Sequence, residues 1–464
     1  MSDSEEPLGS KSFGPTVFIS NLSEDVWPFI ENISNLKARN TEIEENANLA
    51  DRDLFSLARQ ERIVLITPKP VSGEFLNYYK DLFGKRQIEV LVPQNHSGKI
   101  CEDILKDQRV MDALITIANS YRRLTLITYS TSPYFLELVR VLRAKGLTIY
   151  TPESPEEIDG WTVNFFGSKS GIRQLFQNGR AEEPDLIMPP GYICFGIEDA
   201  AKIASKIYLK EKGVVIKTNK GHCGLGVLIF RPGDLVLDYP DCKKQIYDLL
   251  DKEDYWDKFP IVVEEFINVN SSAPAAFPNV EFKILKSGQV EFLYSCSMRV
   301  TKDGVFRGIE INDDVISDRI EAQIIDTGFY IGEQYAKNGY RGYFEIDFIK
   351  DKNNKVYASE SNVRRTGGTH VYETAVELFD KDFMYDVYVL SQNTYPLPEG
   401  KKFIFGQVKE LLTPILYNKK TKEGLVIISE NLLVQNKLAY IIFARNKKRA
   451  EELENQMKSY IINQ

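Results

Sequence analysis

The sequence has little of what marks secreted, zinc-binding, membrane-bound or nucleic-acid-binding proteins. Its five cysteines are odd in number and widely spread over 464 residues, so neither a disulfide framework nor a zinc pattern is expected. The net charge of −8 disfavours nucleic acid and anionic membranes as main partners, because both require a basic face. No apolar run reaches membrane-spanning length, and the start of the chain lacks the basic and apolar regions of a signal peptide. We therefore expect a cytoplasmic protein that binds neither nucleic acid nor membrane.

Familiar catalytic motifs are missing as well. No Gly-Lys-Ser/Thr sequence opens a helix as in a Walker A loop, and no dinucleotide-binding glycine fingerprint is present. Neither a Ser-His-Asp nor a Cys-His motif is evident. His222 and Cys223 are adjacent, but phosphate contact or simple loop filling is favoured over a covalent or base role. The remaining composition, with 43% hydrophobic and 27% charged residues, is ordinary for a globular protein of two or three domains.

The N-terminal third alternates predicted strands with predicted helices. Such repetition predicts a parallel sheet. Residues 1–13 are acidic and rich in Ser and Gly, so a disordered lead is expected. The expected strands cover 62–67, 88–92, 124–128 and 147–150, and the expected helices cover 74–83, 103–120 and 133–145.

A glycine-rich segment over 214–230 is a candidate phosphate site, predicted as strand, loop and strand. Glycines let backbone N–H groups close on phosphate oxygens, and Lys217 or Lys220 supplies a positive charge. A glycine-rich hairpin without a ligand is the alternative. The candidate phosphate contacts are Lys217, Lys220, Gly221, His222, Gly224 and Gly226.

The sequence pattern of residues 345–362 predicts a β-hairpin. We expect its turn at Asn353-Asn354, since Asn tolerates the left-handed backbone of such turns. A symmetric turn there places Asp347 opposite Glu360 and Glu345 opposite Asn362. Because side chains alternate along a strand, Asp347, Glu360 and Asn362 share one face. Like charges opposed in a sheet are destabilising unless they are neutralised, and hard oxygen ligands are what Mg²⁺ takes. A solvated polar hairpin face is the alternative.

Loop and hairpin together resemble the ATP-grasp ligases, and the resemblance runs over most of the chain. The segment 167–173, which contains Lys169, is similar to the one that carries the family's first nucleotide-binding lysine. Lys217 follows on a strand, as the second lysine does. Residues 261–267 look like the family's linker beside adenine, and Arg364 follows the hairpin as in the family's metal-binding pair.

The resemblance implies roles for these residues. Asp347, Glu360 and Asn362 would hold Mg²⁺, with Mn²⁺ as an alternative, against the phosphates of ATP. Arg364 would meet the γ-phosphate or an acyl-phosphate. In the linker, the backbone after the glutamate would contact the base and a nearby acid would bind ribose. The linker candidates are Glu264, Glu265, Phe266 and Ile267, and Glu281 is preferred to Glu265 as the ribose acid.

Arg299 is a further catalytic candidate, because it stands on a predicted strand between the adenine linker and the metal hairpin. A buried strand seldom keeps an arginine unpaired, so an anionic partner is expected. That partner is either a substrate phosphate or a core carboxylate.

The segment from Glu360 to His370 resembles the ending found in the pheganomycin-type peptide ligases. The implied fold class is α/β: a pre-ATP-grasp α/β domain, an ATP-grasp fold of two α+β lobes that clamp ATP, and a small C-terminal α/β cap. The expected boundaries are 1–13 for the lead, 14–160 for the pre-ATP-grasp domain, 161–395 for the ATP-grasp domain and 396–464 for the cap.

The implied function is that of an ATP-dependent carboxylate–amine ligase. Such an enzyme forms an amide or peptide bond through an acyl-phosphate and releases ADP and phosphate. Its expected partners are ATP, a small carboxylate or amino acid, and an amine, amino acid or peptide acceptor; family members often dimerise, so a homodimer is one expected assembly. Acyl transfer to a carrier and a non-catalytic, ATP-binding regulatory role are the alternatives. The presence of both lysines and all three metal ligands favours the ligase.

Overall fold

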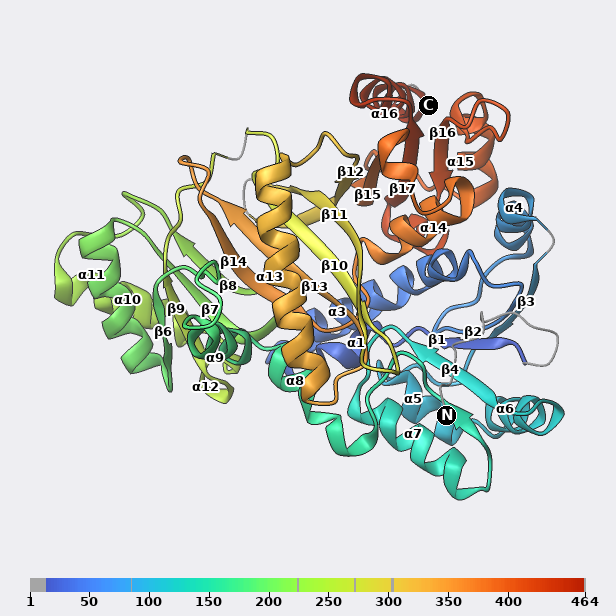
Figure 1. The fold of residues 1–464 in the computed structure, drawn as a ribbon, viewed down its shortest axis with the longest axis horizontal. Coiled ribbons are helices and arrows are strands. Elements are labelled where there is room, and N and C mark those ends of the chain that lie inside the picture. Colours follow the sequence, from blue (N-terminus) through green and yellow to red (C-terminus); the bar gives the residue numbers. More distant parts are fainter. Residues whose placement is uncertain (1–13, 85, 223–224, 271–272, 302–303, 463–464) are drawn as a thin grey trace.

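The computed structural model describes residues 14–84, 86–222, 225–270, 273–301 and 304–462. Strands within these ranges form three sheets, of five, eight and four strands (Figure 1). The expected lead, residues 1–13, lies outside the described residues. None of the helices described is both long and apolar enough to cross a membrane.

The N-terminal sheet is entirely parallel, as predicted, with the strand order β3-β2-β1-β4-β5. One face packs against α5–α7 and the other against α4 and the 3₁₀-helix η1, so the strands are buried on both sides. The strands are β1 (Thr16–Ile19), β2 (Arg62–Ile66), β3 (Gln87–Leu91), β4 (Leu124–Thr128) and β5 (Ile149–Tyr150). The helices are α1 (Leu22–Asp25), α2 (Trp27–Ile30), α3 (Leu36–Leu49), η1 (Ala50–Leu57), α4 (Gly73–Phe83), α5 (Ile100–Lys106), α6 (Gln108–Ser120) and α7 (Pro133–Ala144).

The prediction of one continuous helix over 103–120 was wrong. The chain is extended at Asp107, which separates α5 from α6. The Asp107 carboxylate caps α6 by accepting from the backbone N–H groups of Arg109 and Val110. An aspartate satisfies these N–H groups best when it precedes the helix, so capping overrides the continuous apolar periodicity.

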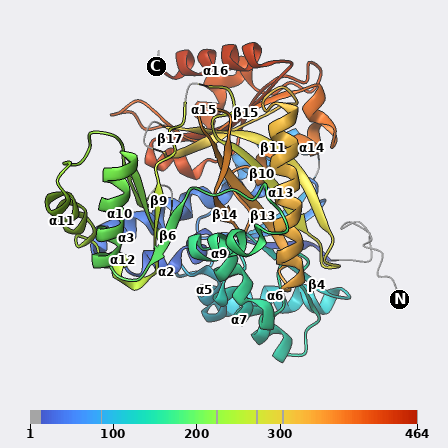
Figure 2. The same cartoon turned by 60° about the vertical axis from the view of Figure 1, so that its left-hand side comes forward.

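The small lobe is a four-stranded antiparallel sheet in the order β6-β9-β7-β8, with α10 and α11 packed on it. The glycine-rich segment forms the hairpin of β7 and β8, as predicted. The small lobe comprises β6 (Gly191–Cys194), β7 (Val214–His222), β8 (Leu225–Phe230), β9 (Ile261–Glu265), α10 (Ile197–Glu211), α11 (Tyr239–Leu250) and α12 (Tyr255–Lys258). It is preceded by η2 (Glu157–Asp159), α8 (Trp161–Phe166) and α9 (Lys169–Gly179), and α9 lies beside β14 (Figure 2).

The central sheet has eight strands in the order β14-β13-β10-β11-β12-β15-β17-β16, and every pairing in it is antiparallel. The long helix α13 crosses one face (Figure 1). The strands are β10 (Pro278–Ile284), β11 (Val290–Val300), β12 (Phe306–Ile311), β13 (Gly342–Lys350), β14 (Val356–Asn362), β15 (Tyr388–Pro396), β16 (Gly424–Ile427) and β17 (Lys437–Ala444). The helices are α13 (Asp318–Lys337), α14 (Thr369–Phe379), η3 (Phe383–Tyr385), α15 (Phe405–Leu412), η4 (Thr413–Ile415), η5 (Asn431–Gln435) and α16 (Lys447–Ile462).

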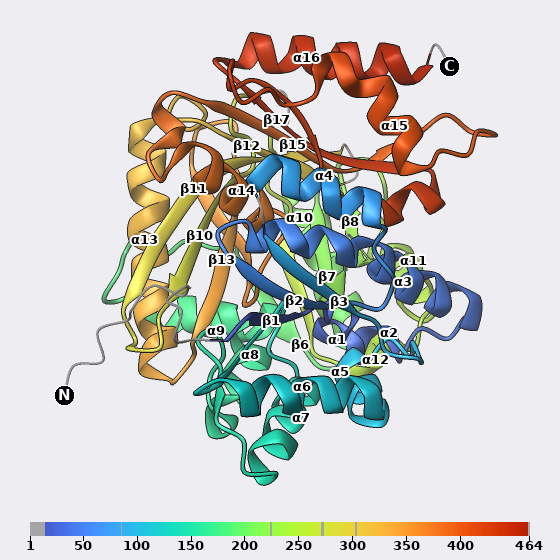
Figure 3. The same ribbon diagram turned by 90° about the vertical axis from the view of Figure 1, so that its right-hand side faces the viewer.

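The C-terminal segment is continuous with the rest of the molecule. The expected boundary at 395/396 falls within β15, and β16 and β17 extend the central sheet. The division of the chain into an ATP-grasp domain and a cap at this position remains a proposal. One hydrophobic core joins Phe55 and Phe75 of the N-terminal domain to Ile427 and Ile441 near the C-terminus. Figure 3 shows the C-terminal elements lying over α4.

A buried ion cluster fastens the N-terminal domain to the segment after β14. Glu153 accepts from Arg365 Nη2 at 2.6 Å and lies 3.1 Å from Lys283 Nζ. Burial alone would raise the pKa of Glu153, but the charges of Arg365 and Lys283 outweigh burial and hold that pKa below its usual value. Arg365 thus makes a salt bridge to a carboxylate that precedes the small lobe.

We expect Glu153→Gln to lower the free energy of unfolding by about 3–5 kcal/mol at pH 7, because it leaves Arg365 buried without its counter-charge. Since the folded-state pKa is depressed, the Glu153 carboxylate stabilises the fold above its unfolded pKa, and this contribution disappears as pH falls through the folded pKa. Denaturant unfolding at pH 7 and pH 3 measures both effects. A loss that is equal at the two pH values would contradict the charge argument.

Candidate active site

The predicted hairpin of β13 and β14 has the predicted pairing at its polar end. Glu345 pairs with Asn362 and Asp347 pairs with Glu360. Asn354 adopts the left-handed backbone expected of the turn, with a φ of 62°. The register beside the turn differs, because Phe348 pairs with Ala358, one position off the symmetric register. A β-bulge between Asp347 and Phe348 restores the predicted pairing at the polar residues.

Two polar rows cross the neighbouring strands β10, β13 and β14. Pairing aligns Asn279 with Asp347 and Glu360 in one row, and Glu281 with Glu345 and Asn362 in the next. Because paired residues point to the same face, six oxygen-bearing side chains gather there. Asp347 accepts from Asn279 Nδ2 at 2.6 Å and from Asn362 Nδ2 at 3.2 Å.

The carboxylates of this cluster oppose one another's ionisation. Burial raises the pKa of Asp347 well above its usual value, and the charges of Glu345 and Glu360 raise it further. Burial and the charge of Glu281 likewise raise the pKa of Glu345 to about 7. Glu360 behaves differently, because Lys169 holds its pKa down to about 2. The cluster is thus a site where added positive charge is favourable.

Lysines of other elements face these carboxylates. Lys169, the first residue of α9, has its Nζ 3.1 Å from Glu360 Oε2. Lys217 of β7 lies 2.7 Å from Glu264, and Arg173 of α9 lies 2.6 Å from the other oxygen of the same carboxylate. Burial would raise the pKa of Glu264, but Lys217 and Arg173 hold it below its usual value. The structure therefore brings both predicted lysines to the hairpin and its neighbouring linker.

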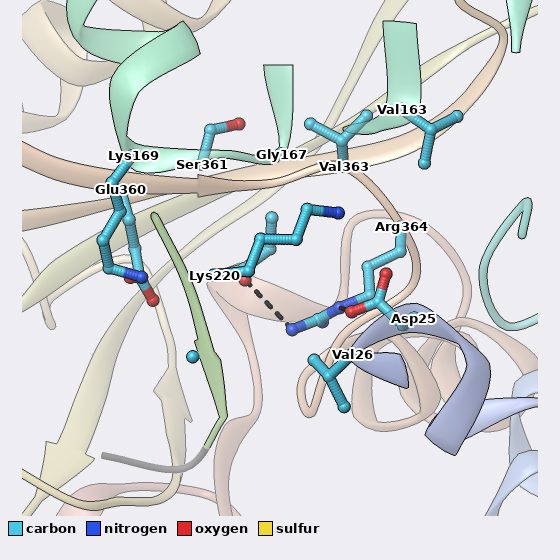
Figure 4. A pocket seen from close by; sticks show the side chains of 12 residues that line it. Asp25, Val26, Val163, Gly167, Lys169, Lys220, Glu360, Ser361, Val363 and Arg364 are labelled. Atoms are coloured by element: carbon cyan, nitrogen blue, oxygen red, sulfur yellow. Dashed lines mark hydrogen bonds and ion pairs between the residues drawn. The ribbon is translucent and has the colours of Figure 1, made fainter. Parts of the chain in front are cut away.

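A cleft of about 470 Å³ opens between the domains at this point. Figure 4 shows Lys169 and Glu360 at one side of the cleft, Lys220 in the middle, and Arg364 with Asp25 at the other side. Lys220 donates to Asn164 Oδ1 at 2.9 Å, and burial lowers the pKa of its amine. The cleft thus combines residues of the N-terminal domain, the small lobe and the central sheet.

The glycine-rich loop is only partly described. Gly221 lines the cleft, and His222 ends β7. Gly224, like Cys223, lies outside the described residues. Gly226 has a φ of 78°, and a Cβ there would lie 2.2 Å from Thr218 Cγ2, so this position requires glycine for the fold itself.

The linker candidates lie at the end of β9. The backbone N–H of Glu265 donates to Pro190 O, and that of Phe266 donates to Gly213 O. Glu265, Phe266 and Ile267 are half-buried, whereas Glu264 is buried between its two cations. Glu281 is on β10, fully buried, and accepts from the hydroxyls of Tyr294, Thr366 and Thr369; burial raises its pKa to about 7. Of the two ribose-acid candidates, only Glu265 is in the linker and partly exposed.

Arg299 has a core carboxylate as its partner, which is the second of the alternatives expected for it. Its Nη2 lies 2.8 Å from Glu454 of α16, and its Nη1 donates to Ser391 O. Alternation along β11 places Arg299 on the face where Ser295 bonds to Glu321 of α13, opposite the face of Tyr294 and the polar rows. The geometry therefore gives no support to the prediction that Arg299 is catalytic.

Three contributors to the site were not predicted. Glu345 was placed on the hairpin but not among the candidate ligands, although alternation already put it on their face. Arg173 stands four residues after Lys169, one helical turn along α9, a spacing that indicates a shared face. Asp25 comes from α1, and no local pattern in the sequence connects it with a site 339 residues away.

The donor set of Asp347, Glu360 and Asn362 fits a hard divalent cation. It consists of two carboxylates and an amide, the oxygen ligands that Mg²⁺ prefers, and the raised pKa of Asp347 indicates that added positive charge is favourable there. Asn362 Oδ1 accepts from Arg364 Nη2 at 3.0 Å, so this amide must turn for its oxygen to join the carboxylates. Among the described residues, no group of three or more His, Cys, Asp and Glu side chains is arranged to hold a metal. The candidate set therefore combines two carboxylates with an amide.

Comparisons with known proteins agree with this architecture. Residues 51–144 match the family model of the pre-ATP-grasp domain. L-propargylglycine–L-glutamate ligase from Streptantibioticus cattleyicolor is 23% identical over 341 residues, which cover 68% of this chain and 66% of the relative, just under two thirds of its length.

Solved structures show the same fold at low sequence identity. The complex of biotin carboxylase with β,γ-ATP from Campylobacter jejuni is 11% identical, with a TM-score of 0.56, and the match covers 94% of this chain and 89% of that chain. The biotin carboxylase domain of 2-oxoglutarate carboxylase from Hydrogenobacter thermophilus, in complex with MgADP, ADP and bicarbonate, is 12% identical, with a TM-score of 0.51 and coverage of 93% and 87%.

The fold, with its antiparallel lobes and parallel N-terminal sheet, is that of an ATP-grasp protein. The match of residues 51–144 to the pre-ATP-grasp model, the similarity to the ligase and the shared fold confirm the predicted resemblance to ATP-grasp ligases and the predicted fold class.

We expect Asp347→Asn to raise the stability of the metal-free protein by about 1 kcal/mol at pH 7, because it removes one of the opposed carboxylates. The same change removes a candidate ligand, so the melting temperature should rise less on addition of MgCl₂ with ATP. Thermal unfolding with and without Mg²⁺ and ATP measures both. A metal-free variant that melts below the wild type would contradict the repulsion argument.

We expect Arg299→Met to lower the free energy of unfolding by about 1–3 kcal/mol, because Glu454 and Ser391 O lose a charged donor. ATP turnover per folded molecule should stay within twofold of the wild type. Denaturant unfolding and single-substrate kinetics measure the two effects, with Arg445→Met, a change at an exposed position, as the control. A selective loss of turnover without loss of stability would restore the catalytic assignment.

Proposed function

We propose that the protein is an ATP-dependent carboxylate–amine ligase that forms an amide or peptide bond through an acyl-phosphate and releases ADP and phosphate. The observation that carries this proposal is the meeting of Glu360 and Asn362, two members of the candidate metal set, with Lys169, Lys220 and Arg364 around one cleft. Asp347 is the third member of the set and pairs with Glu360 across the hairpin. Oxygen ligands beside several cations suit a metal-bound polyphosphate better than any neutral ligand. The amide-forming name of the Streptantibioticus relative supports the choice of reaction.

The residues in and near the cleft have different roles in the proposed phosphoryl transfer. A carboxylate is a poor electrophile, so transfer of the γ-phosphoryl group of ATP to it creates a reactive acyl-phosphate, which an amine then attacks to give the amide. Lys169, Lys217, Lys220 and Arg364 bind and orient phosphate oxygens and offset the charge that develops on them. Mg²⁺ held by Asp347, Glu360 and Asn362, with Mn²⁺ as an alternative, supplies further neutralisation of that charge when bound.

We assign the adenosine half of ATP to the C-terminal end of β9 and the residues that follow it. Glu265, Phe266 and Ile267 provide partly exposed backbone for the base, and Glu265 provides a half-buried carboxylate for ribose. Glu264 fixes Lys217 and Arg173 instead of facing ligand. The acid substrate is a small carboxylate or amino acid, and the acceptor is an amine, amino acid or peptide.

Two other functions share parts of this chemistry. Acyl transfer to a carrier uses the same activated carboxylate, and a regulatory protein needs only ATP binding. The complete set of metal ligands and lysines favours turnover over a regulatory role. A homodimer is proposed as the assembly, as in the dimeric biotin carboxylase domain.

The test is release of ADP and phosphate from Mg·ATP in the presence of pooled amino acids and short peptides. We expect turnover that needs both an acid and an amine, and a mass-spectrometric product equal to their sum minus water. Glu360→Gln should lower kcat at least about 100-fold, because it removes a metal ligand and the partner of Lys169.

Glu451→Gln, a change at an exposed carboxylate on α16, is the matched control and should keep wild-type turnover. Tight Mg·ATP binding by calorimetry without turnover in any pool would favour the regulatory alternative. Product found only on a carrier protein would favour acyl transfer.

A further inference from the structure

Arg364 is held on several sides at once. Its Nε donates to Asp25 Oδ2 at 2.7 Å, and its Nη1 donates to Tyr129 OH at 3.2 Å and to the backbone oxygen of Arg365 at 3.0 Å. Its Nη2 donates to Asn362 Oδ1 at 3.0 Å. Two of these partners, Asp25 and Tyr129, belong to the N-terminal domain.

These contacts leave Arg364 one defined way to meet a ligand. A guanidinium has five N–H donors, and the four bonds account for four of them within the described part of the chain. The fifth is on Nη2, the nitrogen that also bonds Asn362 at the metal hairpin. Arg364 lines the cleft, so this N–H is the donor available to an anion beside the hairpin (Figure 4).

Asp25 is itself fixed by the N-terminal domain. It ends α1, which follows β1, and its Oδ1 accepts from Ser130 Oγ at 2.8 Å. Ser130 follows β4, the parallel neighbour of β1. Asn21 ties the two loops together, since it donates to Ser130 O at 2.8 Å and accepts from Ser130 N at 3.1 Å. The two loops leave the carboxyl ends of β1 and β4, where the strand order of the sheet reverses and where α/β sheets place functional groups.

The contact between Asp25 and Arg364 is charged and largely shielded from solvent. The two side chains are 15% and 16% exposed. Burial would raise the pKa of Asp25, but Arg364 and Lys220 outweigh burial and hold that pKa below its usual value. A carboxylate that stays ionised in such a place fixes the direction of the guanidinium more firmly than a neutral group can.

We propose that Asp25 is a positioning residue of the ligase reaction: the N-terminal domain uses its carboxylate, braced by Ser130, to hold Arg364 so that its remaining N–H faces the phosphoryl group in transit. This inference rests on the proposed function. It assigns the N-terminal domain a part in the chemical step, in addition to packing against the other domains.

Loss of the Asp25 charge should affect the rate of the chemical step more than the binding of ATP. In Asp25→Asn, Arg364 keeps Tyr129 and Asn362 but loses the charged bond at Nε, so its free N–H is no longer held in one direction. A misplaced donor of this kind lowers kcat by about 10- to 100-fold. ATP also contacts the lysines and the linker, so KM for ATP should stay within about threefold.

The experiment is a double-mutant cycle on the full-length protein, with the acid–amine pair found in the ligase assay. The variants are Asp25→Asn, Arg364→Met, the double variant and Ser130→Ala, each checked by its melting temperature. If Asp25 acts through Arg364, the Asp25→Asn change slows the wild type but does not slow Arg364→Met further. Ser130→Ala keeps both charges, folds without an unpaired ion, and should show a smaller loss of kcat in the same direction. Asp112→Asn, at an exposed position of the same domain, is the control and should be unaffected.

The outcomes separate the two proposals. An active wild type with unchanged kcat in Asp25→Asn and Ser130→Ala overturns the positioning role alone. An equal slowing by Asp25→Asn in the presence and absence of Arg364 also overturns it, because Asp25 then acts independently. A wild type without turnover in any pool overturns the proposed function and this inference together.

Discussion

The face of the central sheet that carries Asp347, Glu345, Glu281 and Glu360 concentrates negative charge in a buried place, and the surrounding structure is arranged to offset it. Burying like charges side by side costs free energy unless cations or protons compensate. Different carboxylates of this face are compensated in different ways. Lys169 compensates Glu360, and hydroxyl and amide donors surround Glu281 and Asp347. Burial raises the pKa values of Glu345 and Glu281 to about 7, so their ionised forms are disfavoured.

The compensating groups come from separate elements, so the charge cluster also fixes how the domains meet. Lys169 begins α9, Lys217 lies in the small lobe, and Arg364 reaches the N-terminal domain through Asp25. Removal of Arg364 leaves Asp25 without its paired cation, and removal of Lys217 leaves Glu264 with Arg173 alone. Losing the partner of a largely buried charge costs more than losing an exposed ion pair. The domain arrangement and the chemistry therefore depend on the same contacts.

Local patterns in the sequence predicted much of this site. Alternation and turn chemistry placed Asp347 opposite Glu360, although the symmetric turn that led to this pairing is offset by a bulge. The strands of the parallel sheet followed from their apolar runs, whereas the break at Asp107 was missed because side-chain capping does not alter apolar periodicity. Asp25 and the Glu454 partner of Arg299 could not be predicted, since each contact joins residues far apart in the chain and depends on tertiary packing. The roles of the individual site residues remain predictions that the proposed variants test.

The core shared by Phe55, Phe75, Ile427 and Ile441 has a consequence for the folding of the chain during its synthesis on the ribosome. The helix η1 packs against α14, and α4 packs against α15 and meets β16 at Ile427; these partners are synthesised about 300 residues later or more. Until these later elements emerge, the N-terminal domain exposes apolar surface. Contacts of such long sequence separation form slowly, and exposed surface of this kind favours aggregation. The nascent chain is thus open to aggregation for longer than its parallel sheet alone would imply.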